Sequence, residues 1–130
     1  MLLNYFMQNK IIYRSDNKPE PRLLVDKDVV SGSLFWSIEG MNLQFTWFDV
    51  PANTNFPNHK HDSEQITYVL DGELFFESEN SVYKLSKGDC ILVPGNIDHK
   101  VWTESFPAKA VDAWSPVNKA YATNEDFLNK

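Results

Sequence analysis

The sequence predicts an all-β fold, built as an antiparallel sandwich or barrel. Runs of four to eight residues rich in β-branched and aromatic side chains recur along the 130 residues, and turn-forming pairs separate them. The one stretch with a helix signal is "NEDFLNK" near the C-terminus, which Thr123 precedes as an N-cap. We therefore expect at most a short C-terminal helix beside the strands.

The strands can be placed in order from the turn signals between them. In residues 41–50, Leu43, Phe45 and Trp47 alternate with polar residues, as in a strand with one buried face. Turns are expected at Asp71-Gly72, Lys87-Gly88 and Pro94-Gly95. The predicted strands cover residues 32–38, 41–50, 65–70, 73–79, 81–85, 89–93, 99–103 and 108–115. We expect Trp36, Trp47 and Trp114 to be core aromatics.

The length suits one domain with a single core, which we place at residues 21–130. Residues 1–20 precede the Pro-containing segment "SDNKPEPR" and carry many apolar side chains, so we interpret them as an N-terminal strand or arm. Such an arm could pair with the sheet edge of a second copy and protect that edge. The sequence thus favours a homodimer.

Charge and cysteine content narrow the range of partners. The formal net charge is −6 and the 12 basic residues are scattered, which disfavours nucleic acid and anionic membranes as partners. Nothing approaches the roughly 20 apolar residues of a membrane span. Cys90 is the single cysteine, so a reducing, cytoplasmic location is expected, and we interpret Cys90 as a buried, inert thiol.

The three histidines of the chain form the main chemical signal. His59 and His61 are spaced to share a strand face, and His99 begins a strand just after a Pro-Gly turn. If these strand ends converge, three imidazoles and one oxygen donor can bind a divalent transition metal. Glu64 or Gln65 could supply the oxygen, and strand parity favours Gln65.

These residues resemble the two motifs of the small single-domain cupins. His59, His61, Gln65 and Gly72 match the first motif, with glutamine at the position usually held by glutamate. Gly88, Pro94 and His99 match the second, although Asn96 and Thr103 stand where glycine and asparagine are usual. The resemblance spans roughly residues 40–116. It implies a cupin-type antiparallel barrel (a double-stranded β-helix or jelly roll) with a metal ion held by His59, His61, Gln65 and His99.

The segment "VDAWSPVNKAY" is similar to the end of the pectin- and alginate-pathway cupins that linearise unsaturated uronates. Asp112, Trp114, Ser115 and Pro116 match their pattern, with Trp114 for the usual phenylalanine and Asn118-Lys119 near the position of an arginine. That resemblance implies that Asp112 is the catalytic acid/base. An ordinary solvated or ion-paired aspartate is the alternative. Trp114, Thr67 and Val101 are candidates for lining the substrate site.

The sequence therefore predicts a mononuclear metal-binding protein that acts on a small-molecule ligand or substrate. The favoured function is an enzyme for isomerisation, tautomerisation or ring opening of a small oxygenated, sugar-acid-like compound. One alternative is an iron-dependent oxygenase at the same ligands, and another is a non-catalytic, metal-dependent binding or sensing protein. The metal could be iron, nickel, zinc, manganese or copper, because imidazole-rich sites accept all of them.

Overall fold

A computed structural model describes residues 12–24 and 32–121 of the chain. Within these ranges the structure consists of β-strands joined by turns, with a single 3-10 turn and no α-helix. The all-β prediction is confirmed. The predicted N-terminal strand and C-terminal helix lie in whole or in part outside the described residues. No helix in the described ranges is long and apolar enough to cross a membrane.

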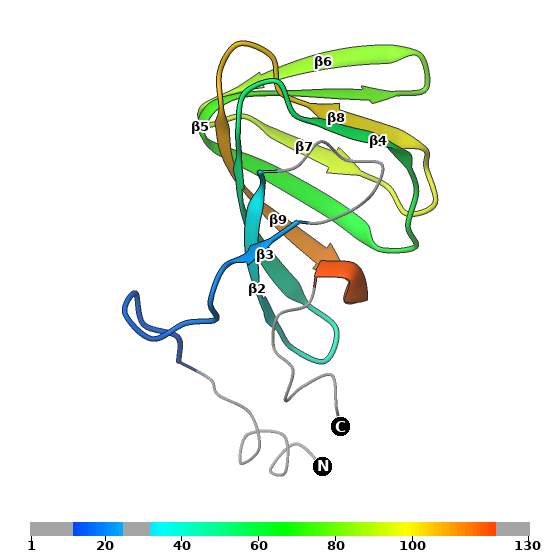
Figure 1. The fold of residues 1–130 in the computed structure, drawn as a ribbon. Coiled ribbons are helices and arrows are strands. Elements are labelled where there is room, and N and C mark those ends of the chain that lie inside the picture. Colours follow the sequence, from blue (N-terminus) through cyan, green and yellow to red (C-terminus); the bar gives the residue numbers. More distant parts are fainter. Residues whose placement is uncertain (1–11, 25–31, 122–130) are drawn as a thin grey trace.

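The strands form two curled antiparallel sheets that face each other (Figure 1). The first sheet has the order β1-β2-β3-β9-β5-β7, and the second has the order β4-β8-β5-β6. The elements are β1 (Arg22–Leu23), β2 (Leu34–Glu39), β3 (Gln44–Val50), β4 (Asn55–His59), β5 (Glu64–Ser78), β6 (Ser81–Ser86), β7 (Cys90–Val93), β8 (His99–Trp102), β9 (Ala108–Ser115) and the 3-10 turn η1 (Lys119–Tyr121).

Strand β5 joins the two sheets because it is continuous where the sequence predicted a turn. Its first half pairs with β9 and β7, and its second half pairs with β8 and β6. Where β5 passes from the first sheet to the second, Gly72 has a φ of 79°. The pairing of β5 with β9 shifts by one residue nearby, between Val69 and Asp71. A Cβ at Gly72 would lie 1.9 Å from the Pro107 carbonyl oxygen, so only glycine fits. The expected reversal at Asp71-Gly72 is wrong: the glycine bends the strand.

The interior between the sheets has an apolar end and a polar end. Residues that pair across β3, β9 and β5 form inward-facing rows. At the apolar end the row is Phe48, Ala110 and Val69. Toward the polar end the next row is Thr46, Asp112 and Thr67. The next row is Gln44, Trp114 and Gln65. All nine side chains are buried, so the barrel interior changes from apolar to polar along the strands.

Three expectations about side-chain direction are wrong: the buried face of β3, the burial of Trp36 and Trp47, and the burial of Cys90. In β3 the polar residues Gln44 and Thr46 point inward, whereas Phe45 is 50% exposed on the outer face. Trp36 and Trp47 stack on that outer face, with ring centroids 4.1 Å apart, and of the three tryptophans expected in the core only Trp114 is buried. Cys90 is exposed because β7 directs Ile91 and Val93 inward instead.

The inward polar residues of β2 and β3 hold the chain that follows β9. Gln44 makes two hydrogen bonds to the backbone of Asn118: its amide donates to the carbonyl oxygen (3.2 Å), and its own oxygen accepts from the N–H (2.7 Å). The Ser37 hydroxyl donates to the Tyr121 carbonyl oxygen at 2.6 Å. These bonds satisfy buried polar groups that would otherwise destabilise the core, and they explain why polar residues face inward here.

Candidate metal centre

His59 and His99 meet because β4 and β8 pair at the polar end of the barrel. The two residues are direct register partners, after an irregularity between Phe56 and His59. Sequence reasoning missed β4, since "NFPNH" has little β propensity and its Pro57 is tolerated only at a sheet edge or bulge. The ring centroids of His59 and His99 lie 4.3 Å apart.

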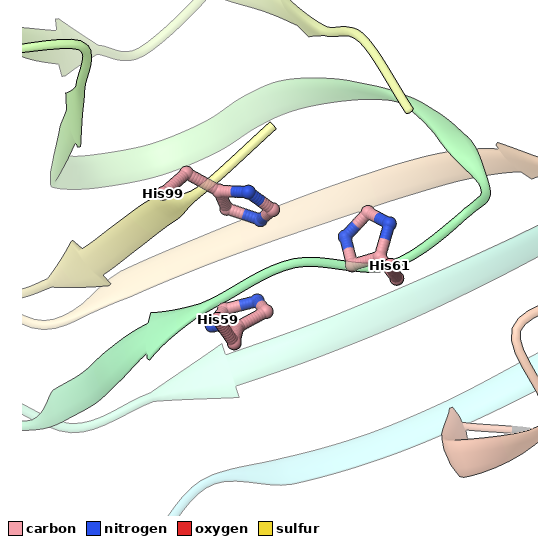
Figure 2. A group of neighbouring side chains, drawn as sticks. All are labelled: His59, His61 and His99. Carbon is pink, nitrogen blue, oxygen red and sulfur yellow. The ribbon is translucent and has the colours of Figure 1, made fainter. Parts of the chain in front are cut away.

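His61 follows β4 and is held by the turn that precedes β8. Asn96, in the left-handed region with a φ of 62°, donates its N–H to the His61 carbonyl oxygen at 2.7 Å. Asparagine tolerates this conformation better than most residues, which explains how it replaces the usual glycine of the cupin motif. A Cβ at Gly95 would lie 2.6 Å from the Asp62 carbonyl oxygen, so the two segments are in close contact. Figure 2 shows the resulting cluster, with three imidazoles gathered together.

The backbone fixes which nitrogen of each imidazole carries the proton. Each Nδ1 lies within hydrogen-bond distance of a carbonyl oxygen: Pro57 for His59 (2.7 Å), Ser63 for His61 (2.9 Å) and Ile97 for His99 (2.9 Å). A carbonyl oxygen only accepts, so Nδ1 must donate, and Nε2 of the neutral ring keeps its lone pair. This is the arrangement that orients metal-binding histidines.

The Nε2 atoms provide the structural test of whether a metal fits. One potential ligand atom from each histidine lies within 4.8 Å of the others. The Nε2 of His99 is buried without a hydrogen-bond partner among the described residues. An orphaned buried acceptor is costly in the absence of a ligand. A cation shared by the three rings would satisfy it.

Gln65 adds a fourth acceptor to the cluster. Its Nε2 donates to Thr67 Oγ1 (2.8 Å) and to Asp112 Oδ2 (3.3 Å), which directs Oε1 toward His61 Nε2 at 3.0 Å. With the neutral ring that metal binding requires, the lone pairs of His61 Nε2 and Gln65 Oε1 face each other at this distance. A cation between them removes the repulsion, so the donor set N₃O fits a divalent transition metal.

Asp112 lies behind Gln65 on β9 and is 7% exposed. Its Oδ1 accepts a hydrogen bond from Thr67 Oγ1 at 2.6 Å and its Oδ2 accepts the one from Gln65. Burial raises the pKa of the Asp112 carboxyl from 3.8 to about 7, and the Thr67 hydrogen bond opposes that rise. A carboxyl near neutrality can both donate and accept a proton.

Burial has the opposite effect on two of the histidines. It lowers the pKa of His99 from 6.5 to about 4 and also lowers the pKa of His59, while hydrogen bonds to backbone carbonyls partly oppose both shifts. Both rings are therefore neutral over the physiological range. Neutral imidazole is the form that binds a metal.

A cavity of about 40 Å³ lies against this cluster. Seven of the eight residues singled out from the sequence line it, and the eighth, His61, contacts the lining residue Gln65 at 3.0 Å. The lining residues that the sequence identified are His59, Gln65, His99, Asp112, Trp114, Thr67 and Val101. Sequence reasoning missed Tyr121, which stacks on Trp114 at 5.4 Å and closes part of the cavity. Only its position just after the Ser-Pro pair could have pointed to it.

The sequence profile of the Cupin domain family matches residues 46–114, more than half of the chain. The chain belongs to the cupin family. Its motif histidines and Gln65 lie within that match, and in this cupin the three-histidine cluster provides a site for one divalent transition metal ion.

Two kinds of curated protein are similar to this cupin. An uncharacterized protein of Methanocaldococcus jannaschii is 30% identical over 94 residues, covering 71% of this chain and 75% of that protein. An acireductone dioxygenase of Tuber melanosporum is 34% identical over 87 residues, which cover 58% of this chain and 50% of the relative. The chain therefore spans about half the length of the dioxygenases that it matches.

Solved structures support the same fold. An RmlC-like cupin from Shewanella frigidimarina superimposes with a TM-score of 0.73 at 20% identity, covering 89% of this chain and all of the other. KdgF from Halomonas sp. superimposes with a TM-score of 0.70 at 19% identity, covering 83% of this chain and 96% of KdgF. At this level of identity the likeness establishes the jelly-roll architecture.

Proposed function

We propose that this cupin is a mononuclear metal enzyme that isomerises, tautomerises or opens a small oxygenated, sugar-acid-like substrate. His59, His61, His99 and Gln65 hold the metal, and Asp112 moves the proton. The observation that carries the proposal is the close approach of two potential metal-ligand atoms, His61 Nε2 and Gln65 Oε1, at 3.0 Å beside a buried carboxyl. The neutral ligand set leaves the full charge of the ion available for polarising a substrate.

The chain's own residues supply the acid–base part of this chemistry. A bound divalent ion would act as a Lewis acid on a carbonyl or hydroxyl oxygen of the substrate. Thr67 and Gln65 both donate to Asp112, and these bonds hold its carboxyl on the wall of the cavity that His59 and His99 also line. From there Asp112 can remove a proton next to the polarised group and return it to a neighbouring atom.

The cavity limits how a substrate reaches the site. About 40 Å³ holds one or two water-sized groups, so only the reacting oxygens enter. A larger cavity of about 690 Å³, bordered by β6 and β7, shares His99 and Phe76 with the smaller one and offers room for the body of a substrate. Arg14 and Arg22, the two arginines, line neither cavity, whereas Lys84 lines the larger one, so the carboxylate of a sugar acid would meet a lysine and not a bidentate arginine.

The second candidate is an iron-dependent oxygenase. It is favoured by the relatives named acireductone dioxygenase, which match this chain at 34% and 35% identity. The same four ligands would serve, and the difference would lie in the consumption of oxygen. We also propose, from the sequence, that the protein is a cytoplasmic homodimer.

The decisive first experiment is the metal content of untagged protein, measured by elemental analysis. We expect close to one transition metal ion per chain, lost in His61→Ala and reduced at least tenfold in affinity in Gln65→Ala. Gln44→Ala is the matched control, because Gln44 is an equally buried glutamine on the same sheet that contacts the C-terminal turn instead. Full metal content in His61→Ala would refute the site.

Assays of turnover, oxygen uptake and ligand binding with the metal-loaded protein then distinguish the candidate functions. Turnover of an unsaturated uronate without oxygen uptake, lost in Asp112→Asn but with the metal retained, supports the isomerase. Oxygen uptake with an enediol substrate supports the oxygenase. Saturable binding of these compounds without turnover of either would refute the enzyme and leave a binding protein.

A further inference from the structure

The outer face of the first sheet is apolar, although an antiparallel sheet normally turns polar residues toward water. The register places one outward row across five strands, ordered β2, β3, β9, β5 and β7. Phe45, Ile66 and Leu92 in this row are 50%, 47% and 57% exposed. The row consists of Ile38, Phe45, Ala113, Ile66 and Leu92.

A second row beside the first has the same character. Trp36 and Trp47 stack at 4.1 Å with an interplanar angle of 2°, and Tyr68 is 43% exposed. The row consists of Trp36, Trp47, Val111, Tyr68 and Cys90. Together the two rows contain no charged residue, and we call them the outer apolar face.

The area of this face matches one side of a protein interface. At roughly 100 Å² for each half-exposed large side chain, the four exposed members and the flanking Leu34, Leu43 and Leu70 present on the order of 700 Å². Stable dimers bury about 800 Å² per partner. Monomeric proteins seldom expose a contiguous apolar patch this large.

The charges around the face suit a second copy of the same chain. Each chain carries a net charge of −6, so two copies repel each other overall. A contact between two uncharged surface patches avoids most of this repulsion. At one end of the rows, Asp49 and Lys109 lie side by side on β3 and β9, 3.9 Å apart. At the β2 edge, the Lys18 ammonium lies 4.6 Å from the centre of the Trp36 ring. The rim of the face also includes the exposed carboxylates Asp71, opposite Lys109, and Glu64, opposite Ser115. Because it carries both signs, a two-fold related copy can place a lysine of one chain against a carboxylate of the other.

We propose that the outer apolar face is the surface through which two copies of this chain form a homodimer, with the sheets stacked face to face. Sheets pack in this way about 10 Å apart, with interdigitating side chains. The inference rests on the homodimer proposed above and identifies its surface. It also explains why β2 and β3 direct aromatic side chains away from the barrel interior.

The test compares the full chain with two face variants, Ile66→Lys and Phe45→Lys, by sedimentation velocity at micromolar concentration. We expect the wild type to sediment at twice the 15.0 kDa chain mass. Each variant should raise the dimer dissociation constant at least tenfold while retaining its circular dichroism spectrum. Val82→Lys is the matched control, because Val82 is 58% exposed on β6 of the other sheet and should leave the dimer intact.

The single cysteine provides an independent readout. Cys90 lies opposite Tyr68 at the end of the second row, so its alkylation should be slowed in the dimer and accelerated in both face variants. A monomeric wild type would overturn the homodimer and its surface together. If both folded face variants remained dimeric, the homodimer would stand and this surface would be refuted. Loss of that dimer on deletion of residues 1–14 would then assign the contact to the N-terminal arm.

Discussion

The two ends of the barrel interior are built from the same strands but by different physical means. At one end, Val50, Val69 and Leu74 pack as ordinary apolar core residues. At the other end, Gln65, Thr67 and Asp112 form a chain of buried hydrogen bonds that leads to the three imidazoles. Packing at the first end depends on volume and on the exclusion of water. The second end depends on the satisfaction of each polar atom.

The difference indicates that the apolar end mainly determines the stability of this cupin and that the polar end mainly determines its metal binding. A void at the apolar end costs transfer and cavity free energy but leaves the donor set unchanged. A change at the polar end alters charge and metal affinity while removing little apolar contact. Variants at the two ends should therefore affect stability and metal content independently.

The largest expected effect on stability is at the apolar end. Leu74→Ala removes a side chain that is 3% exposed, and we expect a loss of about 2–5 kcal/mol in the free energy of unfolding. The matched control Leu23→Ala, at a side chain 52% exposed, should cost less than about 1 kcal/mol. Urea melts of metal-free protein measure both changes. If folded Leu74→Ala lost its metal, the two ends would be coupled and the comparison would fail.

The next effect is a pH dependence at the polar end. The pKa of Asp112 is about 7 in the folded chain and 3.8 as its ordinary value, so between these values the folded state holds a proton that the unfolded state has released. Stability of the metal-free protein should therefore fall as the pH rises from about 4 to 7, by at most about 4 kcal/mol from this group. Asp112→Asn cannot ionise and should remove that decline.

Urea unfolding of metal-free, chelator-treated protein at pH 5 and pH 8 checks the direction of this change in stability. The free energy of unfolding of Asp112→Asn minus that of the wild type should be larger at pH 8 than at pH 5. Asp49→Asn, at an exposed carboxylate on the same sheet, should leave the pH dependence unchanged. Equal slopes in Asp112→Asn and the wild type would show that the buried carboxyl does not control it.

Much of the metal end could be predicted from the sequence because its determinants are local. The spacing of His59, His61 and His99 relative to the glycine and proline positions predicts that the rings converge, and parity correctly predicts that Gln65 points inward, as does Thr67 on the same face. These are short-range patterns, in which a strand or a turn fixes the direction of the next side chain.

The direction of β2 and β3 could not be predicted, because it depends on contacts with distant residues. Apolar alternation at Phe45 and Trp47 predicts that these side chains face the core, yet Gln44 faces inward to bind Asn118, 74 positions further on. A single sequence shows the period of a strand without showing which face meets a partner. The continuity of β5 was missed for a similar reason, since Gly72 is required by contact with Pro107.

The smallest expected effect tests how much of the metal end is backbone geometry. Asn96 has a φ of 62°, and its contribution to the site is an N–H donated to the His61 carbonyl oxygen. Asn96→Gly keeps that bond and adopts the same conformation freely, so stability should change by less than about 1 kcal/mol and metal content should be unchanged. Asn96→Val should cost about 1–3 kcal/mol, because a β-branched residue is strained there, and it should weaken metal binding by displacing His61. Elemental analysis and urea melts of both variants measure these effects. Metal loss in Asn96→Gly would mean that the asparagine side chain matters for the site in addition to the turn it forms.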